Sequence, residues 1–290
     1  MRRKPQSIEE LLRSRLDDLT RAERQVAHAL LDGYPVSGLG SITQVAGSAQ
    51  VSGPTVMRLA RKLGFEGFTE FQEALRREVA AKISDPIRKR ESWTTGAPGS
   101  PLIARFAEAV ESNLRQTIGQ IEPAAFDAAA ACLADTRRRV LITGGRITRS
   151  MADYLFNHLQ VIRPDVSQLG AAPGIWPHYL LDVRPGDVVV VFDIRRYENA
   201  LLRLAEMAHG RGAEIVLFTD QWGSPIGKIA RHRFSAHIEA PSAWDSSVAI
   251  LMIVEALIAA VQDLNWQQAK ARMETLERIF DETRLFRKFV

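Results

Sequence analysis

The chain has 290 residues, 46% of them hydrophobic; this length suits two domains, and this composition excludes a mainly disordered chain. It carries 38 Lys and Arg against 34 Asp and Glu. The excess lies in the first third, because residues 1–91 hold 16 basic and 12 acidic side chains and the remainder holds 22 of each. This asymmetry favours a polyanionic partner for the first third alone, with a fluctuation of surface charge as the alternative. A single cysteine, Cys132, excludes an internal disulfide and fits a reducing cytoplasm.

Helical periodicity dominates residues 7–83. Apolar residues at three- and four-residue spacings predict a helix over 8–19. Thr20 and Glu23 have the spacing of a capping box and open a second helix, which we expect to end near Gly33. Further helices are expected over 42–49, 51–64 and 69–83. The first third is therefore predicted to be a domain of three to five helices.

Residues 84–100 have the composition of a linker, with two prolines, two glycines and a charge run. We therefore expect a helical domain over 1–83 and a second domain over 101–290. In the second domain, helical stretches alternate with short apolar runs that read as strands. The expected strands are 140–142, 166–169, 187–192, 214–220 and 233–240. This alternation predicts a doubly wound, parallel, five-stranded sheet covered by helices on both faces.

The longest apolar run, 248–261, is shorter than the roughly 20 residues that a bilayer needs, and Glu255 interrupts it. The charged first residues do not form a signal peptide. We therefore expect a cytoplasmic protein with no membrane partner. The run 248–261 is predicted to be a buried helix that forms part of a subunit contact. An amphipathic tail contributes another part, through Met273, Leu276, Ile279 and Phe280.

The segment "ITQVAGSAQVSGPTVMRLARKLGF" contains two short predicted helices joined by a tight turn at 50–52. Ser52 is placed to cap the second helix, and Pro54 falls in its first turn. The second helix has an apolar stripe at Val56, Leu59, Ala60 and Leu63. Another face carries Thr55, Arg58 and Lys62, flanked by Arg61. Hydroxyls at the helix start and cations further along suit a helix lying in the major groove of DNA. An ordinary amphipathic surface helix is the alternative.

The stretch "VSGPTVMRLARKLGFEGFTEF" closely resembles the helix-turn-helix of the RpiR-type bacterial transcription regulators. In that family a Val-Ser-x-x-Thr-Val-x-Arg turn and helix leads into a Lys-Leu-Gly-Phe-x-Gly-Phe exit. The resemblance implies DNA contacts from Ser52, Thr55, Arg58 and Lys62, to which the helix face adds Arg61. It also implies that Phe65, Phe68 and Phe71 pack the exit loop onto the domain. The Gly53-Pro54 pair departs from the usual pair of the family, which affects the contacts expected with individual bases but not the expected fold.

Residues 101–290 resemble the sugar isomerase (SIS) domain of such regulators, a flavodoxin-like doubly wound sheet that senses phosphosugars. Ligands of open parallel sheets bind where the strands end in turns. The first such turn holds Gly144, Gly145, Arg146 and Thr148. The SIS pattern there is Gly-x-Gly-x-Ser, so Arg146 replaces the second glycine and Thr148 keeps the hydroxyl. A structural strand-to-helix turn without a ligand is the alternative.

The second turn follows the run DVVVVF and holds Asp193, Arg195, Arg196 and Glu198. SIS domains usually place Ser-x-Ser-Gly-x-Thr there, so the hydroxyl cradle is absent. Two guanidinium groups suit an anion, whereas the two acids repel one. The alternative is a closed network in which both arginines pair with Asp193 and Glu198 and no ligand binds.

Three further expectations concern the remainder of the chain. Ser242 or Asp245 is expected to cap the helix that follows. The histidines show no ligand spacing and there is one cysteine, so we expect no metal and no cofactor. Catalysis is not expected, although His178 and Glu198 have the residue types of an acid and a base.

These observations predict a transcription regulator that binds operator DNA and a small anionic effector, as a homodimer or homotetramer. Two alternatives remain. One is a sugar-phosphate isomerase with an accessory helical domain, and the other is an architectural DNA binder whose SIS dimer has no ligand.

Overall fold

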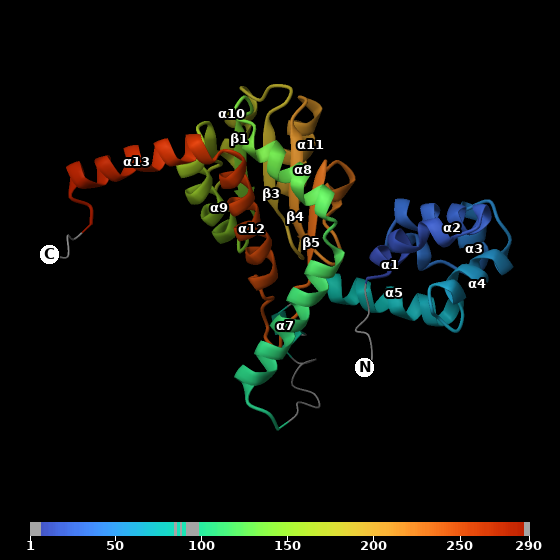
Figure 1. Cartoon of the computed structure of the whole chain (residues 1–290). Coiled ribbons are helices and arrows are strands. Elements are labelled where there is room, and N and C mark those ends of the chain that lie inside the picture. Colours follow the sequence, from blue (N-terminus) through green and yellow to red (C-terminus); the bar gives the residue numbers. More distant parts are fainter. Residues whose placement is uncertain (1–6, 84–85, 88, 91–98, 287–290) are drawn as a thin grey trace. The chain divides into compact units, whose positions relative to one another are not determined.

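The computed structural model describes residues 7–83, 86, 87, 89, 90 and 99–286 (Figure 1). The chain divides into two compact units, Met1–Lys89 and Arg90–Val290. Most of the predicted linker at 84–100 lies outside the described residues, so its structure stays a prediction.

The first unit is a set of short helices around one apolar core. Its helices are α1 (Ile8–Arg15), α2 (Arg21–Asp32), α3 (Ile42–Ser48), α4 (Gly53–Lys62) and α5 (Phe68–Ile83). The predicted helix over 8–19 is shorter than expected, because Leu16–Asp18 forms a 3₁₀ turn that leads into the next cap. The predicted capping box at Thr20 and Glu23 is confirmed, and Ser7 and Ser41 begin α1 and α3 in the same way. Each box satisfies backbone N–H groups that a helix start leaves unpaired.

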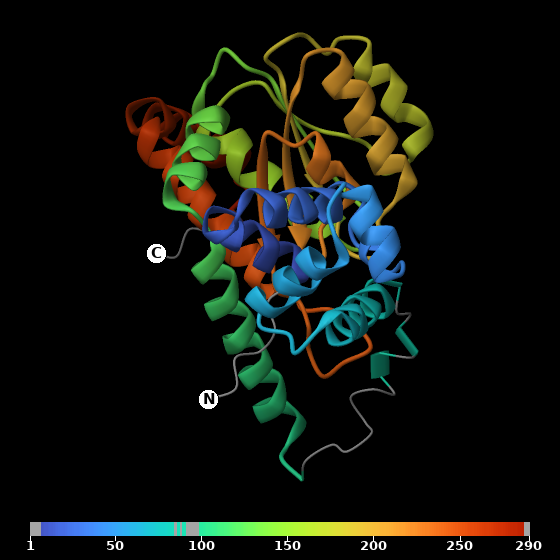
Figure 2. The same ribbon diagram turned by 90° about the vertical axis from the view of Figure 1, so that its right-hand side faces the viewer.

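The second unit is a parallel sheet with helices on both faces (Figures 1 and 2). Its strands are β1 (Val140–Gly144), β2 (Val166–Gln168), β3 (Val188–Phe192), β4 (Glu214–Asp220) and β5 (His232–Ala236). They pair in the order β2-β1-β3-β4-β5, and every pair is parallel. This is the flavodoxin-like order, so the predicted doubly wound five-stranded sheet is confirmed.

The helices of the second unit follow the strands as the sequence predicted, with one short addition. They are α7 (Leu102–Gln120), α8 (Pro123–Ala134), α9 (Arg149–Ile162), α10 (Trp176–Leu180), α11 (Asn199–Gly210), α12 (Val248–Leu264) and α13 (Trp266–Thr283). Side chains alternate between the two faces of each strand, so the core has one part on each face of the sheet. Leu141, Val189 and Leu217 pack in one cluster with residues of α10 and α11, whereas α8 and α9 each pack against α12. The short helix α10 was not predicted from the sequence.

The helix α12 buries one face within its own unit, which is less than the predicted burial on most sides. Seven of its 17 residues are buried, among them Ile253 and Leu257. No single described helix is both long and apolar enough to cross a bilayer; α12 and α13 reach that length only together, and they meet at an angle of 100°.

Candidate functional site

Helices α3 and α4 form a helix-turn-helix at residues 42–62. The turn reverses at Gln50, whose φ of 53° lies in the left-handed region, and the Val51 amide donates to the Ala46 carbonyl at 2.9 Å. The apolar stripe of α4 is buried as predicted, with Val56 and Leu59 no more than 2% exposed. The opposite face of the helix is therefore left to solvent.

Three residues near the start of α4 form a hydrogen-bonded chain on that face. The Arg58 guanidinium donates to Thr55 Oγ1 at 2.9 Å, and Ser52 Oγ lies 3.1 Å from the same atom. Ser52 and Arg58 are exposed, whereas Thr55 is only 4% exposed. Thr55 therefore presents little surface of its own and instead holds the Arg58 side chain. The predicted capping by Ser52 is wrong in detail: Ser52 is the N-cap residue, but its hydroxyl contacts Thr55 and no backbone N–H.

Lys62, at the end of α4, is tied to α2. Its Nζ donates to Glu23 Oε2 at 2.8 Å and to the Asp18 carbonyl at 3.2 Å. Burial favours the protonated form of Glu23, but the hydrogen bonds from Lys62 and from Thr20 outweigh it and lower the pKa of Glu23. Lys62 thus joins two helices of the unit, in addition to any contact with DNA.

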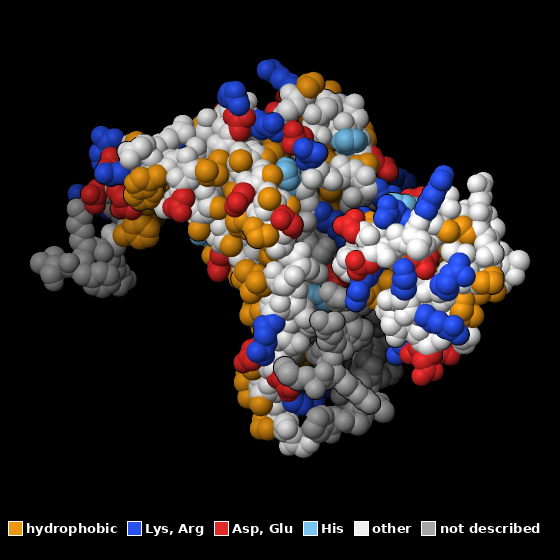
Figure 3. Space-filling model, turned by 45° about the vertical axis from the view of Figure 1, so that its right-hand side comes forward, with side chains coloured by type: hydrophobic (Ala, Val, Ile, Leu, Met, Phe, Trp, Pro, Cys, Tyr) orange, Lys and Arg blue, Asp and Glu red, His pale blue; other side chains and the backbone are white. Residues whose placement is uncertain are grey.

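Arg61 and the aromatic exit loop complete the description of this region. Arg61 is exposed, and its Nε donates to the Glu66 carbonyl at 3.4 Å. Figure 3 shows further Lys and Arg side chains on the visible face of the helical unit. These three rings of the exit loop pack together with the core of the helical unit: the ring centroids of Phe65 and Phe68 lie 5.5 and 5.9 Å from that of Phe71. The predicted packing of the exit loop is therefore confirmed.

The second candidate site lies at the carboxyl ends of β1 and β3, where the two predicted turns meet. A Cβ on Gly144 would lie 2.8 Å from the Thr148 carbonyl oxygen, so only glycine fits this turn. The Thr148 hydroxyl donates to the carbonyl of Phe192, the last residue of β3, at 2.7 Å. The hydroxyl that the SIS pattern retains is therefore used to join the first turn to the next strand.

Glu198 crosses from the second turn to the first. Its Oε1 accepts a hydrogen bond from the Arg146 amide at 2.7 Å, and a Cβ on Gly145 would lie 2.7 Å from the same oxygen. This amide belongs to the turn that leads into α9, the kind of place where helical proteins bind phosphate or carboxylate. A carboxylate of the chain itself thus occupies a position suited to an external anion.

Arg195 is also engaged by a carboxylate, but not by the predicted one. Its Nε lies 2.9 Å from Asp245 Oδ2 and its second terminal nitrogen 2.5 Å from Oδ1, and the Arg195 side chain is 4% exposed. The guanidinium lies 4.1 Å from the centroid of the Trp222 ring, a cation–π contact. The alternative closed network with Asp193 and Glu198 is therefore wrong about the partner of Arg195, which is Asp245.

The predicted capping by Ser242 or Asp245 is also wrong. Asp245 holds Arg195, and Ser242 Oγ accepts from the Trp244 amide; Ser246 Oγ, instead, accepts from the Val248 amide at the start of α12. The loop before α12 is thus tied to the second turn through its acid.

Asp193 directly follows β3, Asp220 is the last residue of β4, and both are buried. Asp193 accepts from the Ser224 hydroxyl and the Glu198 amide, and burial raises the pKa of Asp193 to about 6. Asp220 accepts from the Tyr197 hydroxyl at 2.7 Å and the Arg195 amide at 2.5 Å. These acids fix the backbone of the second turn, and only Arg146 and Arg196 of the predicted effector residues are exposed.

Sequence reasoning missed Asp220 and Trp222 as parts of this site, and it named Asp245 as a helix cap and not as the partner of Arg195. A signal for Asp220 was present in the sequence, because this acid is the last residue of a buried strand, at the end of the sheet where ligands bind. Trp222 lies in a loop, and no sequence pattern pointed to it.

Family comparisons assign each unit. A family described as "Helix-turn-helix domain, rpiR family" matches residues 6–82, and the SIS domain family matches residues 133–260. Among curated proteins, the Escherichia coli K12 regulator RpiR is 24% identical over 280 residues, which cover 93% of this chain and 91% of that protein. The Pseudomonas aeruginosa regulator HexR is 26% identical over 225 residues, covering 76% and 75%.

Solved structures show the same fold. The sugar isomerase domain of an RpiR transcription factor from Sphaerobacter thermophilus aligns with a TM-score of 0.57 at 24% identity, covering 61% of this chain and 97% of that one. The Vibrio vulnificus NanR protein complexed with ManNAc-6P aligns with a TM-score of 0.55 at 18% identity, covering 94% and 98%.

Proposed function

The chain belongs to the RpiR-type transcription regulators, and from this premise we propose that α4 binds operator DNA while the carboxyl edge of β1 and β3 binds a small anionic metabolite, such as a phosphosugar. The curated relatives are named transcription regulators, which makes this chain a regulator and not an isomerase. On this proposal, Glu198 has no role as a catalytic base.

One observation carries the effector proposal: Glu198 accepts a hydrogen bond from the Arg146 amide at the turn before α9. A phosphate oxygen makes the same hydrogen bond and adds charge, which the nearby exposed guanidinium groups of Arg146 and Arg196 attract. NanR, which shares the fold, was solved with ManNAc-6P bound. A phosphosugar is therefore the ligand class that we propose to displace Glu198.

Displacing Glu198 or Asp245 changes contacts of the segments that lead into α11 and α12. Glu198 is the N-cap residue of α11, and Asp245 lies in the loop before α12. A ligand that replaces these carboxylates moves the start of α11 or the loop before α12, and so shifts the population of DNA-competent arrangements. A coupling of about 1–3 kcal/mol changes operator affinity roughly 5- to 150-fold.

The test measures operator binding by fluorescence anisotropy at fixed, modest salt, with promoter fragments from the protein's own gene region and a panel of sugar phosphates. Glu198→Gln keeps an acceptor for the Arg146 amide but removes the charge that repels an anion. We expect the effector concentration at half effect to fall about tenfold, equivalent to about 1.4 kcal/mol. Glu206→Gln, an exposed acid on the same helix α11, is the matched control and leaves that concentration unchanged.

Two outcomes contradict the proposal separately. If no promoter fragment binds, the DNA-binding role of α4 is wrong. If fragments bind but no sugar phosphate alters binding or melting temperature in wild type or Glu198→Gln, the unit has no effector of this class, as an architectural binder would behave.

A further inference from the structure

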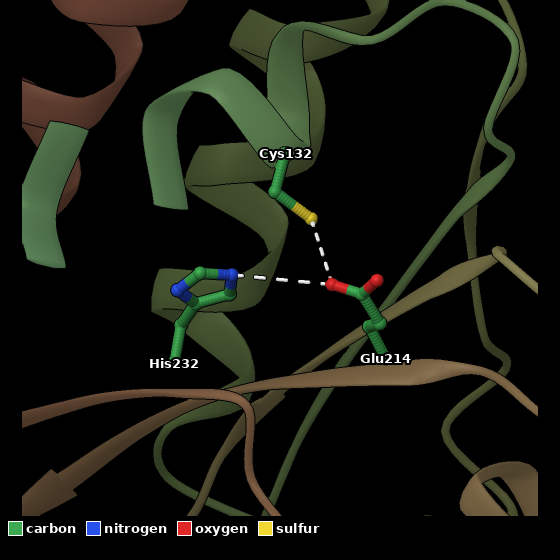
Figure 4. A group of neighbouring side chains, drawn as sticks. All are labelled: Cys132, Glu214 and His232. Atoms are coloured by element: carbon green, nitrogen blue, oxygen red, sulfur yellow. Dashed lines mark hydrogen bonds and ion pairs between the residues drawn. The ribbon is translucent and has the colours of Figure 1, made fainter. Parts of the chain in front are cut away.

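Three side chains that can bind a metal meet near the amino ends of β4 and β5, whereas the proposed effector site lies at the carboxyl ends of the strands (Figure 4). Cys132 lies near the end of α8, Glu214 is the first residue of β4, and His232 is the first residue of β5. Because β4 and β5 are parallel neighbours, their amino ends lie side by side, and the end of α8 brings the thiol to them.

The ligand atoms are close to the spacing of a metal site. Glu214 Oε2 lies 3.7 Å from Cys132 Sγ and 4.0 Å from His232 Nε2, and all three atoms lie within 4.8 Å of one another. A tetrahedral zinc ion, with bonds of about 2.3 Å to sulfur and about 2.0–2.2 Å to nitrogen and oxygen, separates its ligands by roughly 3.3–3.7 Å. The sulfur and carboxylate already meet this distance, so only the imidazole needs a small shift.

Two cations lie near the group: Arg231 acts electrostatically on His232, and Arg138 contacts the other two side chains directly. Arg138 lies 2.9 Å from Glu214 Oε1, and it donates to Cys132 Sγ at 3.6 Å. It therefore holds the carboxylate by the outer oxygen and leaves Oε2 facing the thiol and the imidazole. Ligating carboxylates are usually hydrogen-bonded in this way by a second residue. A bound divalent ion, a thiolate and a carboxylate together are neutral, so the guanidinium opposes binding only weakly.

We propose that Cys132, Glu214 and His232 bind a zinc-class divalent ion, with water in the fourth position. One sulfur, one nitrogen and one oxygen ligand suit Zn²⁺ or Co²⁺, whereas Mg²⁺ and Ca²⁺ require oxygen ligands. The Glu214 side chain is 33% exposed and provides the open side. The ion replaces the proton of the Cys132 thiol, which leaves for solvent, and it joins α8 to β4 and β5.

This proposal differs from the expectation of no metal, which rested on the spacing of the histidines and on the single cysteine. It does not rest on the proposed function, and its site lies at the amino ends of the strands, whereas the proposed effector site lies at their carboxyl ends.

The test adds Co²⁺ to the full-length protein after chelator treatment and records the ultraviolet and visible absorption. Cys132 is the one cysteine of the sequence, so a thiolate-to-cobalt charge-transfer band can come from no other residue. We expect this band in wild type, its removal by Zn²⁺, and its absence in Cys132→Ser. His232→Ala is expected to weaken Co²⁺ binding at least tenfold, while the matched control His209→Ala, on exposed α11 surface, leaves it unchanged.

A wild-type protein with no band would overturn the site. A band that persists at equal affinity in His232→Ala would also overturn it, since the thiol alone would then bind the ion. Zn²⁺ should raise the melting temperature of wild type but not of Cys132→Ser. An equal rise in both would assign the stabilisation to another part of the chain.

Discussion

Asp193 directly follows β3, is 2% exposed, and accepts hydrogen bonds from Ser224 and Glu198 through its carboxyl group. Burial, with the neighbouring charges of Asp220 and Glu198, raises the pKa of Asp193 to about 6. The folded state therefore binds a proton more tightly than the unfolded chain, in which the pKa is near 3.8. Asp193 stabilises the fold fully below about pH 4, and this contribution is lost as the pH rises through 6.

Asp193→Asn removes this titration while keeping one acceptor oxygen. Between pH 4.5 and 7.5, the free energy of unfolding of wild type should fall relative to that of the variant by about 2 kcal/mol. Urea unfolding followed by tryptophan fluorescence measures this difference, and all five tryptophans lie after residue 92, outside the helical unit. Parallel pH profiles for the two proteins would show that Asp193 is not the titrating group.

The helix α4 combines two roles on one exposed face. Its start presents Arg58, held by Thr55, to solvent, and its end ties Lys62 to the buried carboxylate of Glu23 on α2. From the sequence, Arg58 and Lys62 have the same predicted role, yet in the structure they contact different partners. We therefore expect them to behave differently when removed.

Arg58→Ala should weaken operator binding by about 1–3 kcal/mol, as loss of a base contact does, and leave the melting temperature of the helical unit unchanged. Lys62→Met should lower stability by about 1–2 kcal/mol, because Glu23 loses a partner while buried; the 44% exposure of Lys62 keeps the effect modest. Anisotropy at fixed salt and thermal circular dichroism measure the two effects. Unchanged DNA affinity in Arg58→Ala would remove that residue from the interface.

The whole molecule is predicted to be at least a dimer, because one helix-turn-helix reads only a half-site. Within the second unit, α13 is an 18-residue helix of which only Ala269 is buried. Its predicted apolar residues are only partly covered, and Ile279 is 47% exposed. An amphipathic helix with an uncovered apolar face suits contact with a second copy of the chain.

Light scattering on the full chain should give at least twice the monomer mass of 32.3 kDa. Ile279→Asp should lower the mass toward that of the monomer, since it places a charge on the apolar face. Lys270→Asp, about half a turn around the helix, is the matched control and should leave the mass unchanged. A monomeric wild type, or an Ile279→Asp protein of unchanged mass, would show that α13 does not join the subunits.

Local patterns in the sequence determined most of the fold. The cap at Thr20, the buried run of β3 and the glycine turn at Gly144 each depend on residues within a few positions, so periodicity and capping chemistry predict them. The extent of α1 and the existence of α10 were not predicted, because packing of the unit decides where short helices begin and end.

The sequence by itself determined the two units, the order of their elements and the residues that gather at the carboxyl edge of the sheet. Only the tertiary structure decided which charges are paired. Arg195 pairs with Asp245 across 50 positions and Lys62 with Glu23 across 39, while Glu198 accepts from the backbone amide of Arg146 across 52. A charged side chain takes whichever opposite charge or polar group the folded chain brings within reach, and residue type alone does not show which one that is.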